Sequence, residues 1–232
     1  MALESATQGC SVAVWRDGTV LAHREAIATR AQAEILMPMV QAVRVEAGIS
    51  FAEVEMFAVT VGPGSFTGVR VGLATARALG LAAARPVAGV TTSEAVAWAV
   101  GTKSREEHLV VVLLDSFRSD VYVQPFRLTV QGPVPLGPVR ALVPSALTDF
   151  LADLPAPAVL AGNVRPVGVL PATIAGIAEE THPQAWAVAA VAAAREEMGQ
   201  RRTPEPLYLR PPDVTGPSSR SEGTPQGTPR CF

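Results

Sequence analysis

The sequence predicts an α/β protein of two lobes, and three observations support this prediction. Strand and helix signals alternate through the first hundred residues, whereas the second half is shorter and richer in strands. A polar interval at Gly101–Glu107 separates the halves. From Pro211 onward the chain is dense in Pro, Ser, Gly and Thr and cannot bury enough apolar surface to order itself. We therefore expect an N-terminal lobe at 1–102, a smaller C-terminal lobe at 103–210 and a flexible tail at 211–232.

Local patterns in the first lobe predict a strand hairpin followed by alternating helices and strands. Asp17-Gly18 favours a tight turn between two strands. Apolar residues at i, i+3 and i+4 predict an amphipathic helix over 31–47, which Pro38 should kink and Gly48 should end. The apolar run at 57–61 is too short for a helix and indicates a buried parallel strand. The expected elements are strands at 1–4, 11–15, 19–28, 57–61 and 86–90 and helices at 31–47, 66–84 and 92–100.

The second lobe repeats this order in outline. A strongly apolar strand at 108–114 leads through a polar turn at 115–120 to a returning strand. An alanine-rich helix is expected at 184–198, near the end of the lobe. The other expected elements are strands at 121–129, 133–143 and 157–161 and a helix at 145–154.

Composition and charge argue against several classes of protein. The 232 residues are 48% hydrophobic and 17% charged, so most of the chain should be ordered. The formal net charge is -2 and the cationic residues are scattered, so no basic stripe for nucleic acid is predicted, and any link to RNA should run through partners. Cys10 and Cys231 lack the spacing of a zinc site, and a disulfide framework is not expected.

Targeting signals are not predicted either. Glu4 lies within the first residues, and no basic start is followed by an apolar stretch, so a secretory signal is not supported. The most apolar stretch, Val71–Ala84, is interrupted by Arg77 and falls short of the roughly 20 apolar residues that span a bilayer. We therefore expect a cytoplasmic protein.

The glycine-rich loop at 62–68, GPGSFTG, connects a predicted strand to a predicted helix. Such a turn presents backbone N–H groups and a positive helix end to anions. The loop matches neither standard template, because a Walker loop needs Lys where Val69-Arg70 stands and a dinucleotide fingerprint needs a third glycine at Thr67. The alternative is a tight loop whose glycines allow strand and helix to approach closely. No cofactor is predicted, and the weak candidates for phosphate binding are Gly62, Gly64, Ser65, Thr67 and Gly68.

Small residues recur every four positions along the following helix, at Gly68, Gly72, Ala76, Gly80 and Ala84. They form a stripe that lets another helix or a sheet approach closely. Glycine costs about 1 kcal/mol relative to alanine in a helix interior, so the stripe needs a compensating contact. Packing on the chain's own sheet and packing against another subunit are both open at this point, and both could hold on different faces.

A metal site is not predicted. The three histidines are far apart in the sequence, and none belongs to an HxxH or HxxxH pair. The first helix carries Arg30, Gln32 and Glu34, which cannot form a conventional nitrogen-ligand site.

Catalytic candidates are equally few. Asp115 ends an apolar strand and is either a magnesium or base residue or, as we favour, a turn former. Cys10 has no basic neighbour that would lower its pKa. Glu4 and Ser5 either face a cleft between the lobes or form a short polar loop after the first strand.

Several separated motifs occur together in one order. They are ALESATQGCSVAV, ATRAQAEILMPMV, GPGSFTGVRVGLATARALG, PVAGVTTSEA and EPLYLRPP. Across roughly residues 2–212 this set resembles the bacterial TsaB (YeaZ) proteins. The resemblance implies a two-lobed actin-like ATPase (ASKHA, RNase H-like) fold. It also implies participation in forming N6-threonylcarbamoyladenosine at position 37 of tRNAs that read codons beginning with A.

In that family the catalytic, metal-holding role belongs to the paralogous TsaD, and TsaE contributes ATPase activity. The resemblance therefore implies a non-catalytic partner subunit that binds TsaD, meets TsaE and tRNA only through the complex, and forms a homodimer when isolated. The implied interface is the helix pair at 33–43 and 69–83. The contact residues expected there are Ile35, Leu36, Met39, Val40, Val43, Val69, Gly72, Leu73, Ala76, Arg77 and Gly80.

Two positions depart from the family pattern. Glu4 stands where the family commonly has Asp, and Gln32 stands where many members and TsaD have His, which weakens an enzymatic reading. The chain also starts almost inside its first strand, so a shortened N-terminus is expected. The alternatives are a nucleotide-binding or peptidase-like enzyme of the same fold, because related sequences have carried a glycoprotease label, and a stand-alone dehydrogenase-type nucleotide binder.

Overall fold

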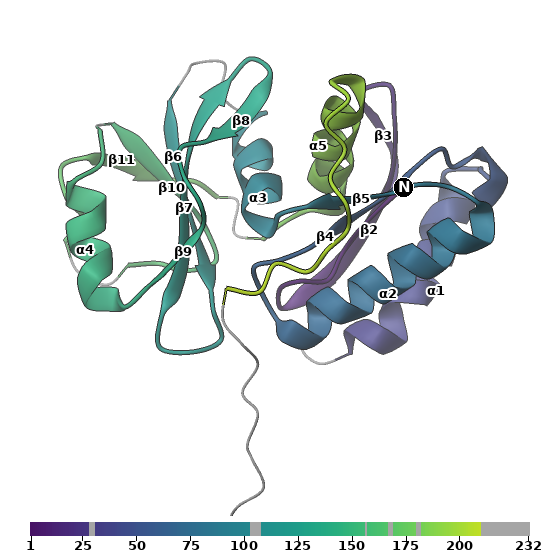
Figure 1. Ribbon diagram of the computed structural model, residues 1–232, viewed down its shortest axis with the longest axis horizontal. Helices are drawn as coiled ribbons and strands as arrows, with labels where there is room; N and C mark the ends of the chain where they lie inside the picture. The colour runs from purple at the N-terminus through teal and green to yellow at the C-terminus, as the bar shows by residue number, and fades with distance from the viewer. Residues whose placement is uncertain (28–30, 103–107, 156, 167–168, 180–181, 210–232) are drawn as a thin grey trace, which may run out of the picture.

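The computed structural model describes residues 1–27, 31–102, 108–155, 157–166, 169–179 and 182–209. They form two lobes, each built around one β-sheet, which lie next to each other along the long axis of the molecule (Figure 1). The predicted tail, Cys231, Arg30 and most of the polar interval between the lobes lie outside the described residues. Within the described ranges, no helix is long and apolar enough to cross a membrane.

The first sheet has five strands in the order β3-β2-β1-β4-β5. β1 pairs antiparallel with β2 and parallel with β4, β2 pairs antiparallel with β3, and β4 pairs parallel with β5. The predicted hairpin turn is confirmed, because Asp17 and Gly18 have φ values of 49° and 79°, the positive values that a tight turn between twisted strands requires. The strands are β1 (Ala2–Glu4), β2 (Gly9–Arg16), β3 (Thr19–Ile27), β4 (Phe57–Thr60) and β5 (Val87–Val90).

The second sheet repeats the topology of the first. Its order is β11-β10-β6-β7-β8, with β9 added on β7. The first strand of this lobe, β6, has an antiparallel neighbour in β7 and a parallel neighbour in β10, as β1 has in β2 and β4. The strands are β6 (Leu109–Asp115), β7 (Val121–Thr129), β8 (Gly132–Pro135), β9 (Arg140–Leu142), β10 (Ala158–Gly162) and β11 (Ile174–Ile177). The single strand predicted at 133–143 is thus two short strands, and the sequence pattern does not predict β11.

Helices cover both faces of the first sheet. α1 and α2 pack on one face and α5 on the other, so the first lobe has two cores (Figure 1). α1 is continuous through Pro38. The helices are α1 (Gln32–Glu46), α2 (Phe66–Ala83), α3 (Thr92–Gly101), α4 (Pro144–Ala152) and α5 (Ala185–Glu197), with a short 3-10 turn, η1 (Phe51–Glu53).

The two lobes are joined by α3, which lies between the sheets (Figure 1). One side of α3 contacts α5, and the other contacts β6, β7, β8 and β10. α5 is part of the range expected for the C-terminal lobe, yet it packs on the first sheet. The range expected for the C-terminal lobe, 103–210, therefore includes a helix that packs on the other lobe. The alanine-rich pattern predicts that this helix is buried, but it does not indicate which sheet buries it.

After α5 the chain returns across the first lobe in an extended segment at residues 200–209. Gly89 N donates to the Arg202 carbonyl oxygen at 2.9 Å, and Leu207 N donates to the Val61 carbonyl oxygen at 2.7 Å. An added Cβ atom at Gly89 would lie 2.7 Å from the Thr203 carbonyl oxygen, so the absence of a side chain there makes room for the segment. We call residues 200–209 the C-terminal strap.

Candidate functional site

The glycine-rich loop packs directly against the loop that follows β1. A Cβ atom added to Gly64 would collide with the Ala6 carbonyl oxygen, and one added to Gly68 would collide with that of Ser5. These glycines therefore allow two backbone segments of the same chain to approach, which is the close-packing alternative of the sequence analysis.

Hydrogen bonds within the chain already use three of the backbone N–H groups of the loop and helix start. Ser65 N donates to the Ala6 carbonyl oxygen at 2.7 Å. Gly68 N donates to Ser65 Oγ at 3.3 Å, an N-cap bond, and Val69 N donates to the Ser65 carbonyl oxygen. These contacts do not support the weak hypothesis of a phosphate cradle at Gly62, Gly64, Ser65, Thr67 and Gly68.

Glu4 and Ser5 are buried within the first lobe. Ala6 N donates to Glu4 Oε1 at 2.7 Å, and Ser5 Oγ donates to the Gly68 carbonyl oxygen at 2.8 Å. Burial raises the pKa of Glu4 to about 8, although hydrogen bonds from the backbone of Ala6 and Thr7 oppose this. The polar-loop alternative is therefore the better description, and Glu4 is largely uncharged at neutral pH.

The surroundings of Cys10 and Gln32 indicate that both residues support the fold. Burial and the neighbouring Glu4 raise the pKa of the Cys10 thiol to about 11, which disfavours the reactive thiolate. Gln32 is buried, and its Nε2 donates to the Thr7 carbonyl oxygen at 3.3 Å, which ties α1 to the loop after β1. Neither residue has the surroundings of a catalytic group.

Asp115 forms a turn at the end of β6. Its Oδ1 accepts a hydrogen bond from Phe117 N at 2.7 Å, and its own N donates to Asn163 Oδ1 at 2.9 Å. The turn-former interpretation explains these contacts. No group of three or more His, Cys, Asp or Glu residues able to hold a metal ion occurs in the described part of the chain.

The small-residue stripe of α2 faces the chain's own sheet. A Cβ atom at Gly72 would lie 2.5 Å from Ser5 Oγ and 3.3 Å from a methyl group of Val59 on β4, and one at Gly80 would lie 2.5 Å from a methyl group of Val87 on β5. The internal alternative therefore holds for this stripe, and the close approach of helix and sheet compensates for the glycines.

Most of the expected interface residues belong to this internal face. Amphipathic spacing identifies the apolar side of each helix, and here that side is buried against the first sheet. Of the expected contacts, only Ile35 and Met39, which are half-buried, and Arg77, which is exposed, reach the surface. The expectation is therefore wrong for direct contact by Leu36, Val40, Val43, Val69, Gly72, Leu73, Ala76 and Gly80, which are buried in the chain's own core.

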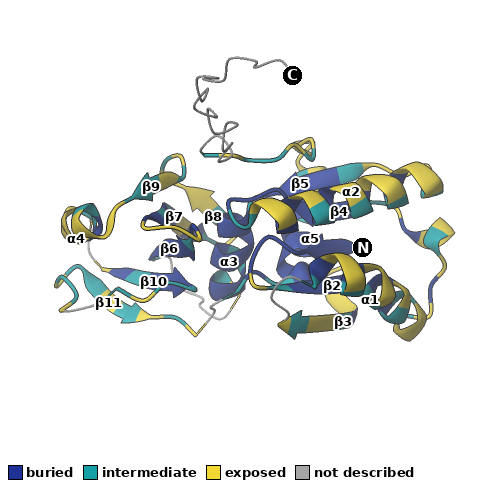
Figure 2. Ribbon diagram, turned by 90° about the horizontal axis from the view of Figure 1, so that it is seen from below, coloured by how far each residue is buried: buried dark blue, intermediate teal, exposed yellow. Residues whose placement is uncertain are grey.

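The outward side of the same helix pair carries apolar residues among charged and polar ones such as Glu34, Gln41 and Arg77. α1 and α2 lie next to each other, and their outward sides are exposed (Figure 2). Leu81 is 85% exposed, Val45 66% and Met37 37%, and these side chains lie on two neighbouring helices. We define the outer helix face as Ala33, Met37, Val45, Ala74, Ala78, Leu81 and Ala82. The alanines at 74, 78 and 82 recur every four residues beside the glycine stripe, and this second stripe is the sequence signal that points to the outer helix face.

The C-terminal strap ends beside the start of α2. The guanidinium carbon of Arg70 lies 3.7 Å from the ring centroid of Phe66 and 5.7 Å from that of Tyr208. Arg70 Nε donates to the Tyr208 hydroxyl at 2.9 Å, and the two rings are 5.3 Å apart. Arg77 Nη2 donates to the Pro204 carbonyl oxygen at 2.6 Å. The strap is thus bound to α2, the helix that carries Ala74, Ala78, Leu81 and Ala82 of the outer helix face.

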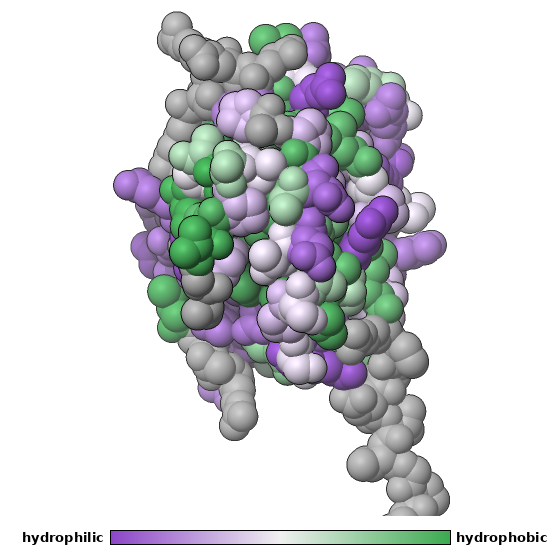
Figure 3. Space-filling model, turned by 90° about the vertical axis from the view of Figure 1, so that its left-hand side faces the viewer, coloured by the Kyte–Doolittle hydropathy of each residue, from purple (hydrophilic) through white to green (hydrophobic). Residues whose placement is uncertain are grey.

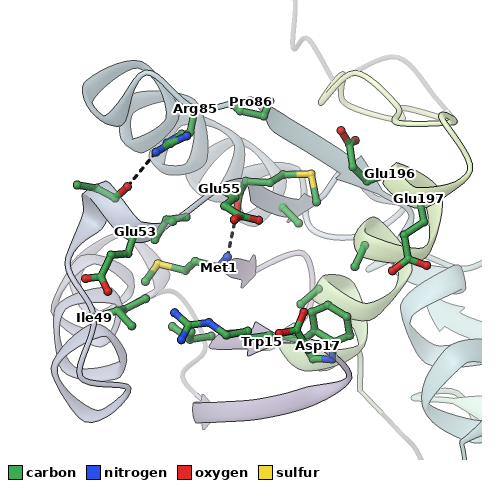
Figure 4. Close-up of a pocket in the computed structure, with 18 residues that line it drawn as sticks. Met1, Trp15, Asp17, Ile49, Glu53, Glu55, Arg85, Pro86, Glu196 and Glu197 are labelled. Atoms are coloured by element: carbon green, nitrogen blue, oxygen red, sulfur yellow. Dashed lines mark hydrogen bonds between the residues drawn. The ribbon is translucent and has the colours of Figure 1, made fainter.

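A cavity of about 750 Å³ lies at the opposite end of the first sheet from the glycine-rich loop (Figure 4). Met1 and Trp15 form part of its apolar lining, and Asp17, Glu53 and Glu197 contribute carboxylates. None of the residues described as lining it is Ser, Thr, Cys, His or Lys. The far end of the second lobe, which carries α4, shows hydrophilic and hydrophobic side chains interspersed (Figure 3).

Comparison with known proteins gives a consistent group of relatives. A family model described as "TsaD: tRNA N6-adenosine threonylcarbamoyltransferase" matches residues 24–131. The tRNA threonylcarbamoyladenosine biosynthesis protein TsaB of Escherichia coli is 38% identical over 122 residues, which cover 53% of this chain and 52% of that protein. A tRNA N6-adenosine threonylcarbamoyltransferase of Erythrobacter litoralis is 46% identical over 68 residues, 29% of this chain and 20% of that protein. The chain spans about half the length of the curated TsaB relatives it matches.

Two solved structures share the fold over most of the chain. A protein from Pseudomonas aeruginosa, described as similar to the peptidase YEAZ, has a TM-score of 0.76 and 25% identity, and the match covers 90% of this chain and 98% of that one. YeaZ from Pseudomonas aeruginosa has a TM-score of 0.74 and 24% identity over the same shares of the two chains.

Proposed function

Because the chain belongs to the TsaB (YeaZ) family, we propose that it is a non-catalytic partner subunit that binds TsaD in the N6-threonylcarbamoyladenosine modification of tRNA. The chemistry then occurs on TsaD, and this chain supplies a docking surface. The outer helix face carries the proposal, because it is apolar, lies on two rigid helices and is not covered by the described part of the chain.

The family-model match supports a particular docking arrangement. It spans residues 24–131, which include both α1 and α2, and we propose that a TsaD-type partner has a corresponding helix pair. Packing one helix pair on the other forms a bundle of four helices, and the small side chains at Ala74, Ala78 and Ala82 let the helix axes approach closely. A second copy of this chain offers the same surface, so we propose a homodimer when TsaD is absent. TsaE and tRNA meet the chain only through that complex, in a cytoplasmic setting.

The two sheets support an actin-like ATPase (ASKHA, RNase H-like) fold for both lobes. Each lobe begins with an antiparallel hairpin and continues with two parallel strands on the other side of its first strand. Within this fold, the backbone contacts of the glycine-rich loop and the burial of Glu4 favour a scaffold over a nucleotide-binding or peptidase-like enzyme. The mismatched glycine fingerprint disfavours a dehydrogenase-type nucleotide binder.

Co-purification with TsaD from the same organism tests the proposal directly. We expect one peak on size-exclusion chromatography that contains both proteins, and threonylcarbamoyl transfer to tRNA by TsaD that requires this chain. A chain that neither binds TsaD by calorimetry nor self-associates has no docking role. ATP turnover or peptide cleavage by the isolated chain, lost in Glu4→Gln or Asp115→Asn, would support the enzymatic alternative instead.

A further inference from the structure

Arginine supplies all of the charge on helix α2. Its 18 residues include Arg70 and Arg77 and no Asp, Glu or Lys. Both side chains are exposed. Because the two residues are seven positions apart, they lie on one side of the helix, about 10 Å apart along its axis. Ala74 and Leu81 of the outer helix face lie on the same side, since residues at i, i+4, i+7 and i+11 share one face of a helix.

The positive charge of this arginine pair is not compensated within the described part of the chain. Arg70 Nε donates to the Tyr208 hydroxyl, and Arg77 Nη2 donates to the Pro204 carbonyl oxygen, so both acceptors are neutral. Neither arginine forms an ion pair with a carboxylate of the described residues. A guanidinium group has five N–H donors, so each arginine keeps donors for a further acceptor.

Contacts with the chain itself restrict both guanidinium groups. Arg70 stacks on the ring of Phe66, and its Nε is bound to Tyr208 of the C-terminal strap. The strap is in turn bound to the first sheet through its backbone. Arg77 is bound to the strap by its hydrogen bond to Pro204. An arginine that is already restricted loses less side-chain entropy when a partner binds, so the pair is prepared for an interface.

We propose that the arginine pair binds two carboxylates of the TsaD-type partner, at the edge of the outer helix face. This assignment rests on the proposed function, which supplies the partner. Helices that pack in a bundle cross at about 20°, so their axes run almost side by side. The two carboxylates therefore belong to one helix of the partner and lie about seven residues apart, the spacing of Arg70 and Arg77.

A second copy of this chain matches the arginine pair less well. Its α2 carries no carboxylate, and Glu46 of α1 is already paired with Arg24. Of the two helices, only Glu34 of α1 then remains for two arginines. The arginine pair therefore favours an acidic partner over self-association, because a copy brings arginines of its own to the same surface.

The association rate with TsaD from the same organism is the direct test, because charges at the edge of an interface act mainly on that rate and on its salt dependence. Arg70→Met and Arg77→Met should each lower the association rate constant by about 3-fold at low salt, measured by stopped-flow fluorescence. The difference from the wild type should vanish near about 1 M NaCl, where the screening length is only about 3 Å. The double variant alone should self-associate at least as strongly as the wild type, as measured by analytical ultracentrifugation.

Control variants separate the charge from the contacts with the strap. Arg70→Lys keeps the charge, and Tyr208→Phe keeps Arg70 but removes the hydroxyl that it binds, so both should retain the salt dependence of the wild type. Arg140→Met removes an exposed arginine of β9 in the second lobe and should bind as the wild type does. If Arg70→Met does not fold, Arg77→Met and Arg70→Lys still decide.

The possible outcomes distinguish this assignment from the proposed function. If the wild type binds TsaD and the methionine substitutions at Arg70 and Arg77 leave the association rate unchanged, the arginine pair does not meet carboxylates, and the proposed function stands. An equal loss of rate in Arg140→Met, or weaker self-association of the double variant, also overturns the assignment. A wild-type chain that does not bind TsaD overturns both.

Discussion

Gly72 leaves room for the side chain of Ser5, because a Cβ atom on Gly72 would lie 2.5 Å from Ser5 Oγ. The same hydroxyl donates to the Gly68 carbonyl oxygen at 2.8 Å. A hydrogen bond therefore joins α2 to the loop after β1. The absence of a side chain at Gly72, one turn after Gly68, lets the two segments approach closely. Stability of the first lobe should depend on this contact.

Gly72→Leu should destabilise the folded chain. A leucine side chain cannot fit between Ser5 and Val59, and overpacking of this kind costs typically 1–3 kcal/mol and more where backbone must move. We expect a loss of about 3 kcal/mol in the free energy of unfolding, measured by urea denaturation. Ala78→Leu, on the exposed side of the same helix, should change it by less than about 0.5 kcal/mol. A stable Gly72→Leu variant that fails only to assemble would instead place the glycine stripe against a partner.

Local chemistry in the sequence predicts much of the first lobe. The Asp17-Gly18 turn, the helix expected at 31–47 and found at Gln32–Glu46, and the helix expected at 66–84 and found at Phe66–Ala83 all follow from patterns within a few residues. Positive φ angles, caps and helical periodicity are decided by neighbours in the chain, so one sequence suffices to find them.

Contacts between distant segments are not predicted in the same way. The apolar spacing in α1 and α2 marks a buried face correctly, but it does not say that β4 and β5, and not a partner, bury it. Similarly, nothing near Ala185–Glu197 indicates that this helix returns to the first sheet. The ion pair of Glu94 and Arg195 joins segments 101 residues apart and has no local signal in the sequence.

Stability should fall as pH rises through the titration of Glu4. Burial raises its folded-state pKa from 4.5 to about 8, so between these values the folded state keeps a proton that the unfolded chain has released. This group should lower the free energy of unfolding by up to about 1.4 kcal/mol per pH unit from about pH 5 to about pH 8. Urea denaturation of wild type and Glu4→Gln at several pH values measures the contribution as the difference in slope. Glu34→Gln, at an exposed carboxyl of α1, should keep the wild-type slope, and parallel curves for Glu4→Gln would contradict the assignment.

Tyr208 should control how firmly the C-terminal strap is held. Tyr208→Phe keeps the ring against Phe66 but removes the hydroxyl that accepts from Arg70, whereas Tyr208→Ala removes both contacts. We expect the Leu207 amide, which donates to Val61, to exchange its hydrogen several-fold faster in Tyr208→Phe and faster still in Tyr208→Ala, since each contact contributes about 1 kcal/mol. Hydrogen exchange by mass spectrometry reports this, with a peptide from β7 as the unchanged reference. Identical exchange in all three proteins would show that the backbone contacts alone hold the strap.

Ala78→Arg should weaken assembly without weakening the fold. Ala78 is exposed in the middle of α2, between Ala74 and Ala82, so an arginine there stays solvated in the free chain but separates the helices of a bundle. The introduced arginine should cost several kcal/mol of binding free energy in a closely packed helix interface. We therefore expect the affinity for TsaD, measured by calorimetry, to fall by at least about 100-fold. Ala152→Arg, at an exposed alanine of α4 in the second lobe, makes the same chemical change far from the outer helix face and should bind as the wild type does. If Ala152→Arg loses binding and Ala78→Arg keeps it, the partner docks on the second lobe, and α1 and α2 serve only to cover their own sheet.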